Sequence, residues 1–95
     1  MGALWISHVT VTDPEKYGEY AKRATQAIVD HGGVFLARGG AYIQKEGEDR
    51  PRNVVARFPS LDAANACYES ALYQEALGFA KQASVRELVI VEEIA

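Results

Sequence analysis

The chain has 95 residues, of which 48 % are apolar and 24 % charged, and its formal net charge is -3. These values are typical of one small globular domain, and we expect a single domain over residues 1–95. A domain of this size buries only about 60 to 65 % of the surface that its unfolded chain exposes, so a second subunit would add useful burial. The negative charge and the lack of a Lys and Arg cluster argue against nucleic acid as a partner.

The single cysteine, Cys67, excludes an intramolecular disulfide and a cysteine-paired zinc site, and it suits a reducing compartment. Its alanine-rich surroundings indicate a packed helix face, with a catalytic thiol as the alternative. No apolar run is long enough to cross a membrane and no signal-peptide pattern is present, so we expect a cytoplasmic protein without a membrane partner. His8 and His31 match no metal-binding motif, and no phosphate loop or dinucleotide fingerprint occurs, so neither a metal nor another cofactor is expected.

The first strand is predicted over residues 3–11, where apolar side chains occur on both alternating faces. Asp13 before Pro14 then predicts a helix start, with Thr12 as the alternative N-cap. Apolar residues at helical spacing extend this helix over residues 14–31, and two glycines end it.

A second strand is expected to open at residues 34–36 and to resume over residues 41–43 after an interruption at Gly39 and Gly40, where a glycine pair indicates a bulge or a close backbone approach. A turn over residues 47–51 leads to a third strand at 53–58, which makes a hairpin.

A second helical region begins after the N-cap Ser60, breaks near Ser70 and continues over residues 73–82. A closing strand is predicted over residues 85–94. The order strand, helix, strand, strand, helix, strand predicts an α+β fold of the ferredoxin-like βαββαβ kind, in which an antiparallel four-stranded sheet carries its helices on one face.

The first and last strands are apolar on both sides, although helices can cover only one face of the sheet. A second copy of the chain is the simplest cover for the other face, and we therefore expect a homodimer. Sequence alone leaves open which alternation faces outward.

Four segments together resemble one family of small proteins, a domain of unknown function with the number thirteen-thirty, within the dimeric α/β barrel superfamily. These segments are residues 9–20 (VTVTDPEKYGEY), 32–40 (GGVFLARGG), 58–64 and 68–74. The resemblance implies a dimer whose sheets face each other, and it implies no activity. Ala80 stands where members of the family often carry an Arg.

Aromatic residues on the helices form the first group of candidate ligand-binding residues. Tyr17 and Tyr20 share the face of the first helix that leans over the sheet, and Tyr73 lies in the second helical region. They can line an aromatic pocket or serve as core residues with their hydroxyls at the rim.

Arg38, beside Gly39 and Gly40, is a candidate for holding a carboxylate or enolate oxygen, because a guanidinium forms two parallel hydrogen bonds to such groups. The alternative is an ion pair with an acid such as Glu92 or Asp30. Arg57 has the same two interpretations. His8 is either a general base in a pocket or a hydrogen-bonded residue beside the core.

These residues predict a homodimer that binds a small organic molecule, anionic or aromatic, between sheet and helices. An enzyme is the alternative, since the superfamily that the chain resembles includes cofactor-independent monooxygenases and lactone isomerases. A structural or regulatory dimer without a ligand is the third possibility.

Overall fold

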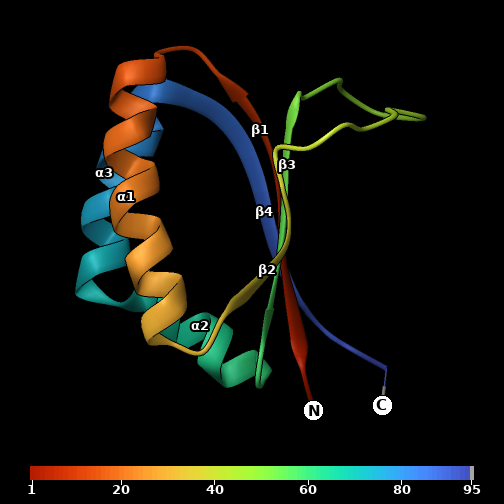
Figure 1. The fold of residues 1–95 in the computed structure, drawn as a ribbon, viewed down its shortest axis with the longest axis vertical. Helices are drawn as coiled ribbons and strands as arrows, with labels where there is room; N and C mark the ends of the chain where they lie inside the picture. The colour runs from red at the N-terminus through yellow and green to blue at the C-terminus, as the bar shows by residue number, and fades with distance from the viewer. Residues whose placement is uncertain (95) are drawn as a thin grey trace.

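Four strands and three helices make up the fold, and the helices all lie on one face of the sheet (Figure 1). The structure is a computed structural model and describes residues 1–94. The sheet is antiparallel with the strand order β2-β3-β1-β4, which confirms the predicted ferredoxin-like α+β fold. In chain order the elements are β1 (Ala3–Val11), α1 (Pro14–Asp30), β2 (Val34–Arg38), β3 (Arg52–Phe58), α2 (Leu61–Glu69), α3 (Ala71–Ala83) and β4 (Ser84–Glu92).

Helix α1 begins and ends close to where its sequence predicts. The Asp13 side chain accepts a hydrogen bond from the Lys16 backbone N–H at 3.2 Å, so Asp13 is the N-cap. At the other end, the His31 ring nitrogen Nδ1 lies 2.8 Å from the Ala27 carbonyl oxygen, and Gly32 follows with a φ of +81°. The chain therefore leaves the helix through a left-handed glycine.

The second strand differs from the prediction. Strand β2 ends at Arg38, and Ala41–Ile43 lie in an exposed loop instead of resuming the strand. The irregularity in strand pairing falls between Phe35 and Ala37, so a bulge at Gly39 and Gly40 is wrong, whereas the alternative, a close backbone approach, holds for Gly39, where a Cβ would lie 2.9 Å from the Arg52 Nη1. The physical reason is that Gly39 adopts a φ of +70°, which turns the chain out of the sheet.

Smaller shifts affect the other boundaries. Helix α3 starts two residues earlier than predicted because Ser70 caps it, its hydroxyl oxygen accepting a hydrogen bond from the Tyr73 N–H at 3.2 Å. Strand β4 covers Ser84–Glu92 instead of 85–94, and β3 begins at Arg52 instead of 53.

The register of β1 and β4 decides which side chains face the helices. Trp5 pairs with Ile90 and Ile6 pairs with Val89. Because Trp5 is buried and Val89 is 55 % exposed, Ile90 faces the helices and Val89 faces away.

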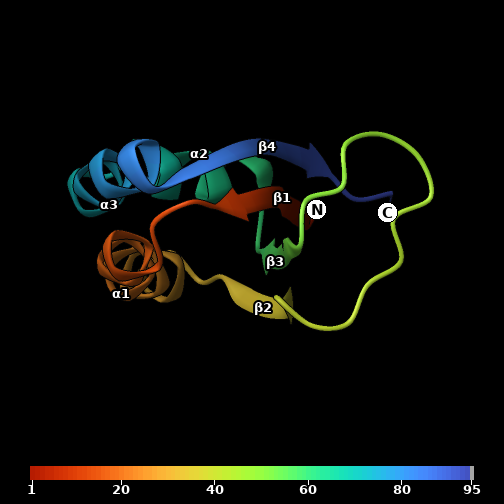
Figure 2. The same ribbon diagram turned by 90° about the horizontal axis from the view of Figure 1, so that it is seen from above.

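Figure 2 shows that no helix covers the other face of the sheet, which we call the open sheet face, and this face carries many apolar side chains. Its residues alternate with the buried ones along each strand and are Leu4, Ile6, Val34, Val55, Val85, Val89 and Val91.

The core lies between the sheet and the three helices and is rich in aromatic rings. Trp5 packs edge-on against Tyr73 with ring centroids 5.0 Å apart, and both are fully buried. Cys67 is buried in the same core, and burial raises the pKa of its thiol to about 11. Over residues 1–94, no helix is long and apolar enough to span a bilayer.

Candidate functional site

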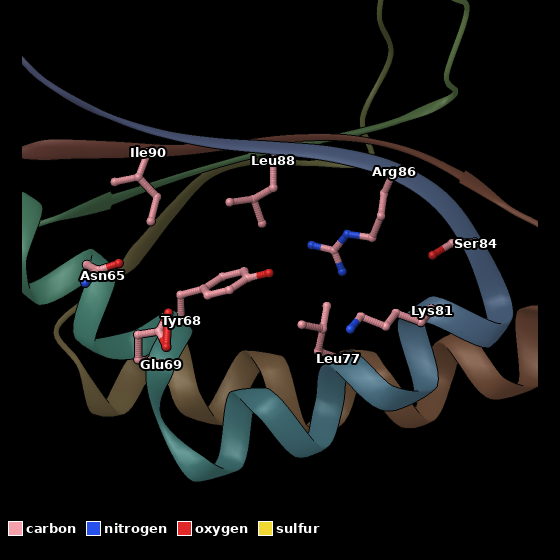
Figure 3. Close-up of a pocket in the computed structure, with 9 residues that line it drawn as sticks. All are labelled: Asn65, Tyr68, Glu69, Leu77, Lys81, Ser84, Arg86, Leu88 and Ile90. Atoms are coloured by element: carbon pink, nitrogen blue, oxygen red, sulfur yellow. The ribbon is translucent and has the colours of Figure 1, made fainter.

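A cavity of about 590 Å³ separates β4 from helices α2 and α3 (Figure 3). Leu88 and Ile90 point into it from β4, and Tyr68 faces them from α2. Its lining therefore combines an apolar wall with a few charged and polar groups. The lining residues are Asn65, Tyr68, Glu69, Leu77, Lys81, Ser84, Arg86, Leu88 and Ile90.

Arg86 is the most unusual residue of this cavity, and Figure 3 shows its side chain pointing from β4 into the open space. Its Nη2 donates a hydrogen bond of 2.9 Å to the Tyr73 hydroxyl oxygen, which lies 3.0 Å from the Tyr20 hydroxyl oxygen. Its Cζ lies 4.7 Å from the centroid of the Tyr20 ring. Its Nη1 is buried and has no hydrogen-bond partner, and no carboxylate within residues 1–94 lies within 4.0 Å of the guanidinium.

The surrounding phenols do not supply the missing negative charge. Burial raises the pKa of Tyr73 far above its ordinary value, and burial also raises the pKa of Tyr17. Burial acts to lower the pKa of Arg86, but the neighbouring Tyr20 and Tyr73 oxygens outweigh it and the pKa is raised. At neutral pH the site therefore holds a positive guanidinium among neutral hydroxyls.

A second arginine stands in the same row of the sheet. Val9 pairs with Arg52 on one side and with Arg86 on the other, so the two arginines flank it on the face that meets the helices. The Arg52 Cζ lies 5.5 Å from the Tyr17 ring centroid, and its buried Nε has no hydrogen-bond partner within the described chain. The ring centroids of Tyr17 and Tyr20 are 5.0 Å apart, so phenols fill the space between the arginines.

Arg52 borders a second, smaller hollow of about 30 Å³ between α1 and strands β2 and β3. Arg38 also lines this hollow, with its Cζ 4.4 Å from the Phe35 ring centroid, and so does Ser7, which is 3 % exposed. Neither Arg38 nor Arg52 forms an ion pair with an acid of residues 1–94 of its own subunit, so Arg38 pairs with neither Glu92 nor Asp30 within one subunit, and a pair with an acid of a second copy stays a prediction.

The structure brings together most of the predicted site residues. Tyr17, Tyr20 and Tyr73 meet in one cluster, and Arg38 lies at the smaller hollow. A Cβ built on Gly39 would lie 2.9 Å from the Arg52 Nη1, whereas one on Gly40 would touch nothing within 4 Å. Gly39 therefore belongs to the surroundings of Arg52, and Gly40 does not.

His8 and Arg57 do not join this cluster, because they face the opposite side of the sheet. The His8 Nδ1 lies 2.6 Å from the Asn53 Oδ1, and the Arg57 Nε donates to the Glu93 Oε1 at 3.0 Å. The structure thus gives Arg57 the ion pair that was its alternative, and it gives His8, which is exposed on the interior strand β1, a hydrogen bond on the open sheet face.

One family of known proteins matches this chain over nearly its whole length. The family model described as "Domain of unknown function (DUF1330)" matches residues 2–94. The chain belongs to this family. A search of proteins with curated functions found no significant match.

Solved structures that resemble this DUF1330 chain share the fold at low sequence identity. A protein of unknown function from Rhodopseudomonas palustris, RPA0582, superimposes with a TM-score of 0.76 and 18% identity, covering 99% of this chain and 83% of that one. SnoaB, a cofactor-independent oxygenase from Streptomyces nogalater, gives a TM-score of 0.69 and 13% identity over 99% of this chain and 94% of its own. A dimeric ferredoxin-like protein of unknown function from Thermobifida fusca gives a TM-score of 0.58 and 17% identity, covering 98% of this chain and 92% of its own.

Sequence reasoning missed both central arginines of this DUF1330 chain. Arg52 directly follows the turn predicted over residues 47–51 and lies outside the strand predicted over 53–58, and Arg86 stands beside Glu87 near the start of the predicted closing strand. One signal was available for Arg86. It alternates with Leu88 and Ile90 on one face of β4, and a lone cation on the face of a strand that meets the core is unusual. Ala80, where relatives were expected to carry an Arg, is fully buried in the core.

Proposed function

We propose that this chain forms a homodimer that binds a small organic anion with an apolar or aromatic body, and that Arg86 holds the anionic group. The observation that carries the proposal is the half-buried Arg86 side chain, whose buried Nη1 has no hydrogen-bond partner in residues 1–94 and which faces no acid of these residues.

A buried charge without a counter-ion is costly, and proteins rarely keep one that serves only stability. Arg86 is held by the Tyr73 hydroxyl, and its Nη1 has no partner in residues 1–94, so a small turn of the guanidinium toward the cavity would let Nη1 donate to an incoming oxygen. A guanidinium presents two parallel donors to a carboxylate, and such charge-assisted bonds are among the stronger ones in proteins. A carboxylate, or the oxygen of an ionised enol or phenol, would therefore complete the site.

The cavity also suits the body of such a ligand. Its volume of about 590 Å³ lies within the range of small-molecule sites, roughly 300 to 1,000 Å³. The side chains of Leu88 and Ile90 give it an apolar wall opposite the Tyr68 ring, against which a flat ring can pack.

The open sheet face supports the dimer part of the proposal. Val89, Val91 and Val85 on this face are 46 to 55 % exposed in one subunit. An interface of ordinary size buries about 800 Å² per subunit, and at about 25 cal/mol per Å² of apolar area it provides enough free energy for association. The Thermobifida fusca structure with the same fold is described as dimeric.

An enzyme is a second candidate, favoured by the same arginine. A cation beside phenolic hydroxyls would stabilise the oxyanion of an ionised enol or phenol, and the structurally similar SnoaB is described as a cofactor-independent oxygenase. Among the residues that line the cavity, Glu69 is the one carboxylate that could accept the proton. Catalysis would require turnover and oxygen consumption, which an oxygen electrode measures directly.

The test of binding compares matched pairs of acid and neutral isostere by thermal shift and calorimetry. Benzoate and phenylpyruvate should raise the melting temperature of the protein, and benzamide should not, because the amide carries no charge for Arg86. Arg86→Gln should abolish the effect of the acids. Lys22→Gln is the control, since Lys22 is an exposed cation of α1 that lines neither the cavity nor the open sheet face.

Equal binding of benzoate and benzamide would contradict the proposal, as would full retention of benzoate binding in Arg86→Gln. A protein that binds none of these acids but remains dimeric would support the structural or regulatory dimer instead.

A further inference from the structure

The hollow beside Arg52 is separate from the cavity of Arg86 and has its own chemical character. It lies on the other side of the tyrosine cluster, between α1 and the β2 edge of the sheet. Arg38, Arg52 and Ser7 line it, together with the Tyr17 and Phe35 rings. Its lining therefore contains two guanidinium groups and four hydroxyl side chains, those of Ser7, Tyr17, Tyr20 and Thr25, and no acidic residue.

The buried Arg52 Nε is the clearest unmet requirement in this region. An N–H group that is removed from water without a partner costs about 1 to 3 kcal/mol, so native proteins leave few of them. In residues 1–94 only two buried side-chain nitrogen or oxygen atoms lack a partner, the Arg52 Nε and the Arg86 Nη1. Both atoms belong to arginines of the same row of the sheet, one on each side of Val9.

The size of the hollow limits what can complete it. A volume of about 30 Å³ exceeds what one water molecule needs, and it is far too small for an aromatic ring. A carboxylate-sized group fits this volume and can accept from Nε with one of its oxygens. We infer that Arg52 anchors a second, carboxylate-sized anionic group in this hollow.

Gly39 provides an independent sign that space is kept around this guanidinium. A Cβ at this position would lie 2.9 Å from the Arg52 Nη1, closer than real Cβ contacts, and the φ of +70° also favours glycine. Any larger residue at position 39 would therefore push the Arg52 guanidinium away from its present place. The loop after β2 thus holds the arginine by close backbone approach.

The anionic group can come from two sources, namely a separate small carboxylate or a second acidic group of the ligand that Arg86 holds. The inference itself needs no ligand in the Arg86 cavity. It can therefore fail while the proposed function holds, and the reverse is also true.

The direct experiment is a titration of the complete chain with formate, in which the ¹H–¹⁵N signals of the arginine Nε–H groups are recorded at each formate concentration. The Arg52 signal, assigned by its loss in Arg52→Gln, should shift saturably as Nε–H finds an oxygen. The exposed Arg57 signal in the same spectrum should move little and without saturation.

Two glycine variants test the position of the guanidinium without changing any charge. Gly39→Ala should weaken formate binding about tenfold or more, because it displaces a charge-assisted donor. Gly47→Ala is the matched control, since Gly47 has a comparable φ of +86° and its Cβ would meet nothing closer than 3.7 Å. It should bind formate as the unmodified protein does.

A comparison of benzoate with isophthalate distinguishes the two sources. If one ligand bridges both arginines, isophthalate should bind about tenfold or more tightly than benzoate, and Arg52→Gln should remove this difference. If the anions are separate, formate and benzoate should bind together, and isophthalate should have no advantage. Either result supports the second anion site.

The inference is overturned if the Arg52 signal does not move with formate, or if it moves no more than the Arg57 signal, which would indicate an adventitious ion only. Equal formate affinity of Gly39→Ala and Gly47→Ala would also overturn it. The titration of the unmodified protein decides the question even if a variant fails to fold.

Discussion

Replacement of Arg86 by Met should increase the stability of the ligand-free protein while it removes anion binding. Met keeps most of the aliphatic length of the side chain and fills irregular core space, so little packing is lost. The change removes one hydrogen bond, from Arg86 Nη2 to the Tyr73 hydroxyl, but that hydroxyl keeps its contact with Tyr20 at 3.0 Å. No acid within 4.0 Å is left behind in residues 1–94, since none pairs with Arg86.

The magnitude follows from two opposing effects. Loss of the hydrogen bond to a charged donor costs about 1.5 to 3 kcal/mol. Removal of a half-buried charge that no acid of residues 1–94 balances returns part of the desolvation free energy of a buried ion, about 3 to 4 kcal/mol. We therefore expect a net stabilisation of about 1 to 2 kcal/mol, which in a domain of this size raises the melting temperature by about 4 to 8 °C per kcal/mol.

The assay is urea unfolding followed by circular dichroism at one fixed protein concentration, because a dimer's stability depends on concentration. The unmodified protein and Lys22→Met, which replaces an exposed cation of α1 away from the open sheet face, are the references. A loss of about 3 kcal/mol or more in Arg86→Met would refute the reasoning, since it would mean that Arg86 stabilises the fold.

Three further predictions concern the fold. Asp13→Ala should lower the free energy of unfolding by about 1 kcal/mol through loss of the N-cap of α1, and an unchanged melting temperature would assign the capping to Thr12. In sedimentation, Val89→Asp should convert the dimer into folded monomers, whereas Ile90→Asp should unfold the subunit. An unmodified protein that sediments as a monomer at micromolar concentration would contradict the proposed dimer. Cys67 has a pKa of about 11, so at pH 8 it should react with a thiolate-selective disulfide reagent about a hundredfold more slowly in the folded than in the unfolded chain. Because the unfolded chain loses this proton first, the free energy of unfolding should decrease as the pH rises from 9 toward 11. Equal reaction rates in both states would contradict this prediction.

Local sequence signals were sufficient for most of the fold. The Asp13 and Ser60 caps each accept a hydrogen bond from the backbone N–H three residues later, as the sequence predicts. Such caps depend on neighbours in the chain, so they can be read without knowledge of the fold. The prediction failed at Ala41–Ile43, where an apolar triplet of strand-forming type lies in a loop, because the turn at Gly39 directs the chain away from β3 before pairing can resume.

The candidate site was predictable only in part, because it depends on register. Tyr17 and Tyr20 share a helix face, which their spacing shows, but the contact of Tyr20 with Tyr73 joins residues that are 53 positions apart. Arg86 and Arg52 meet the same residue, Val9, only once β1 is aligned with both neighbours. A shift of one residue in either pairing would place that arginine on the open sheet face.

The two faces of the sheet have opposite effects on the free energy of folding, and this opposition connects the dimer to the site. On the inner face, Arg52 and Arg86 each leave a buried nitrogen without a partner, which lowers the stability of a small domain whose core is already thin. On the outer face, exposed side chains such as Val89 offer apolar area that is buried only when a second copy binds. Association would thus supply free energy that a lone subunit of this length cannot obtain from its own core. The chain can keep Arg52 and Arg86 without acidic partners among residues 1–94 because dimerisation through the open sheet face offsets the stability that these arginines cost the subunit.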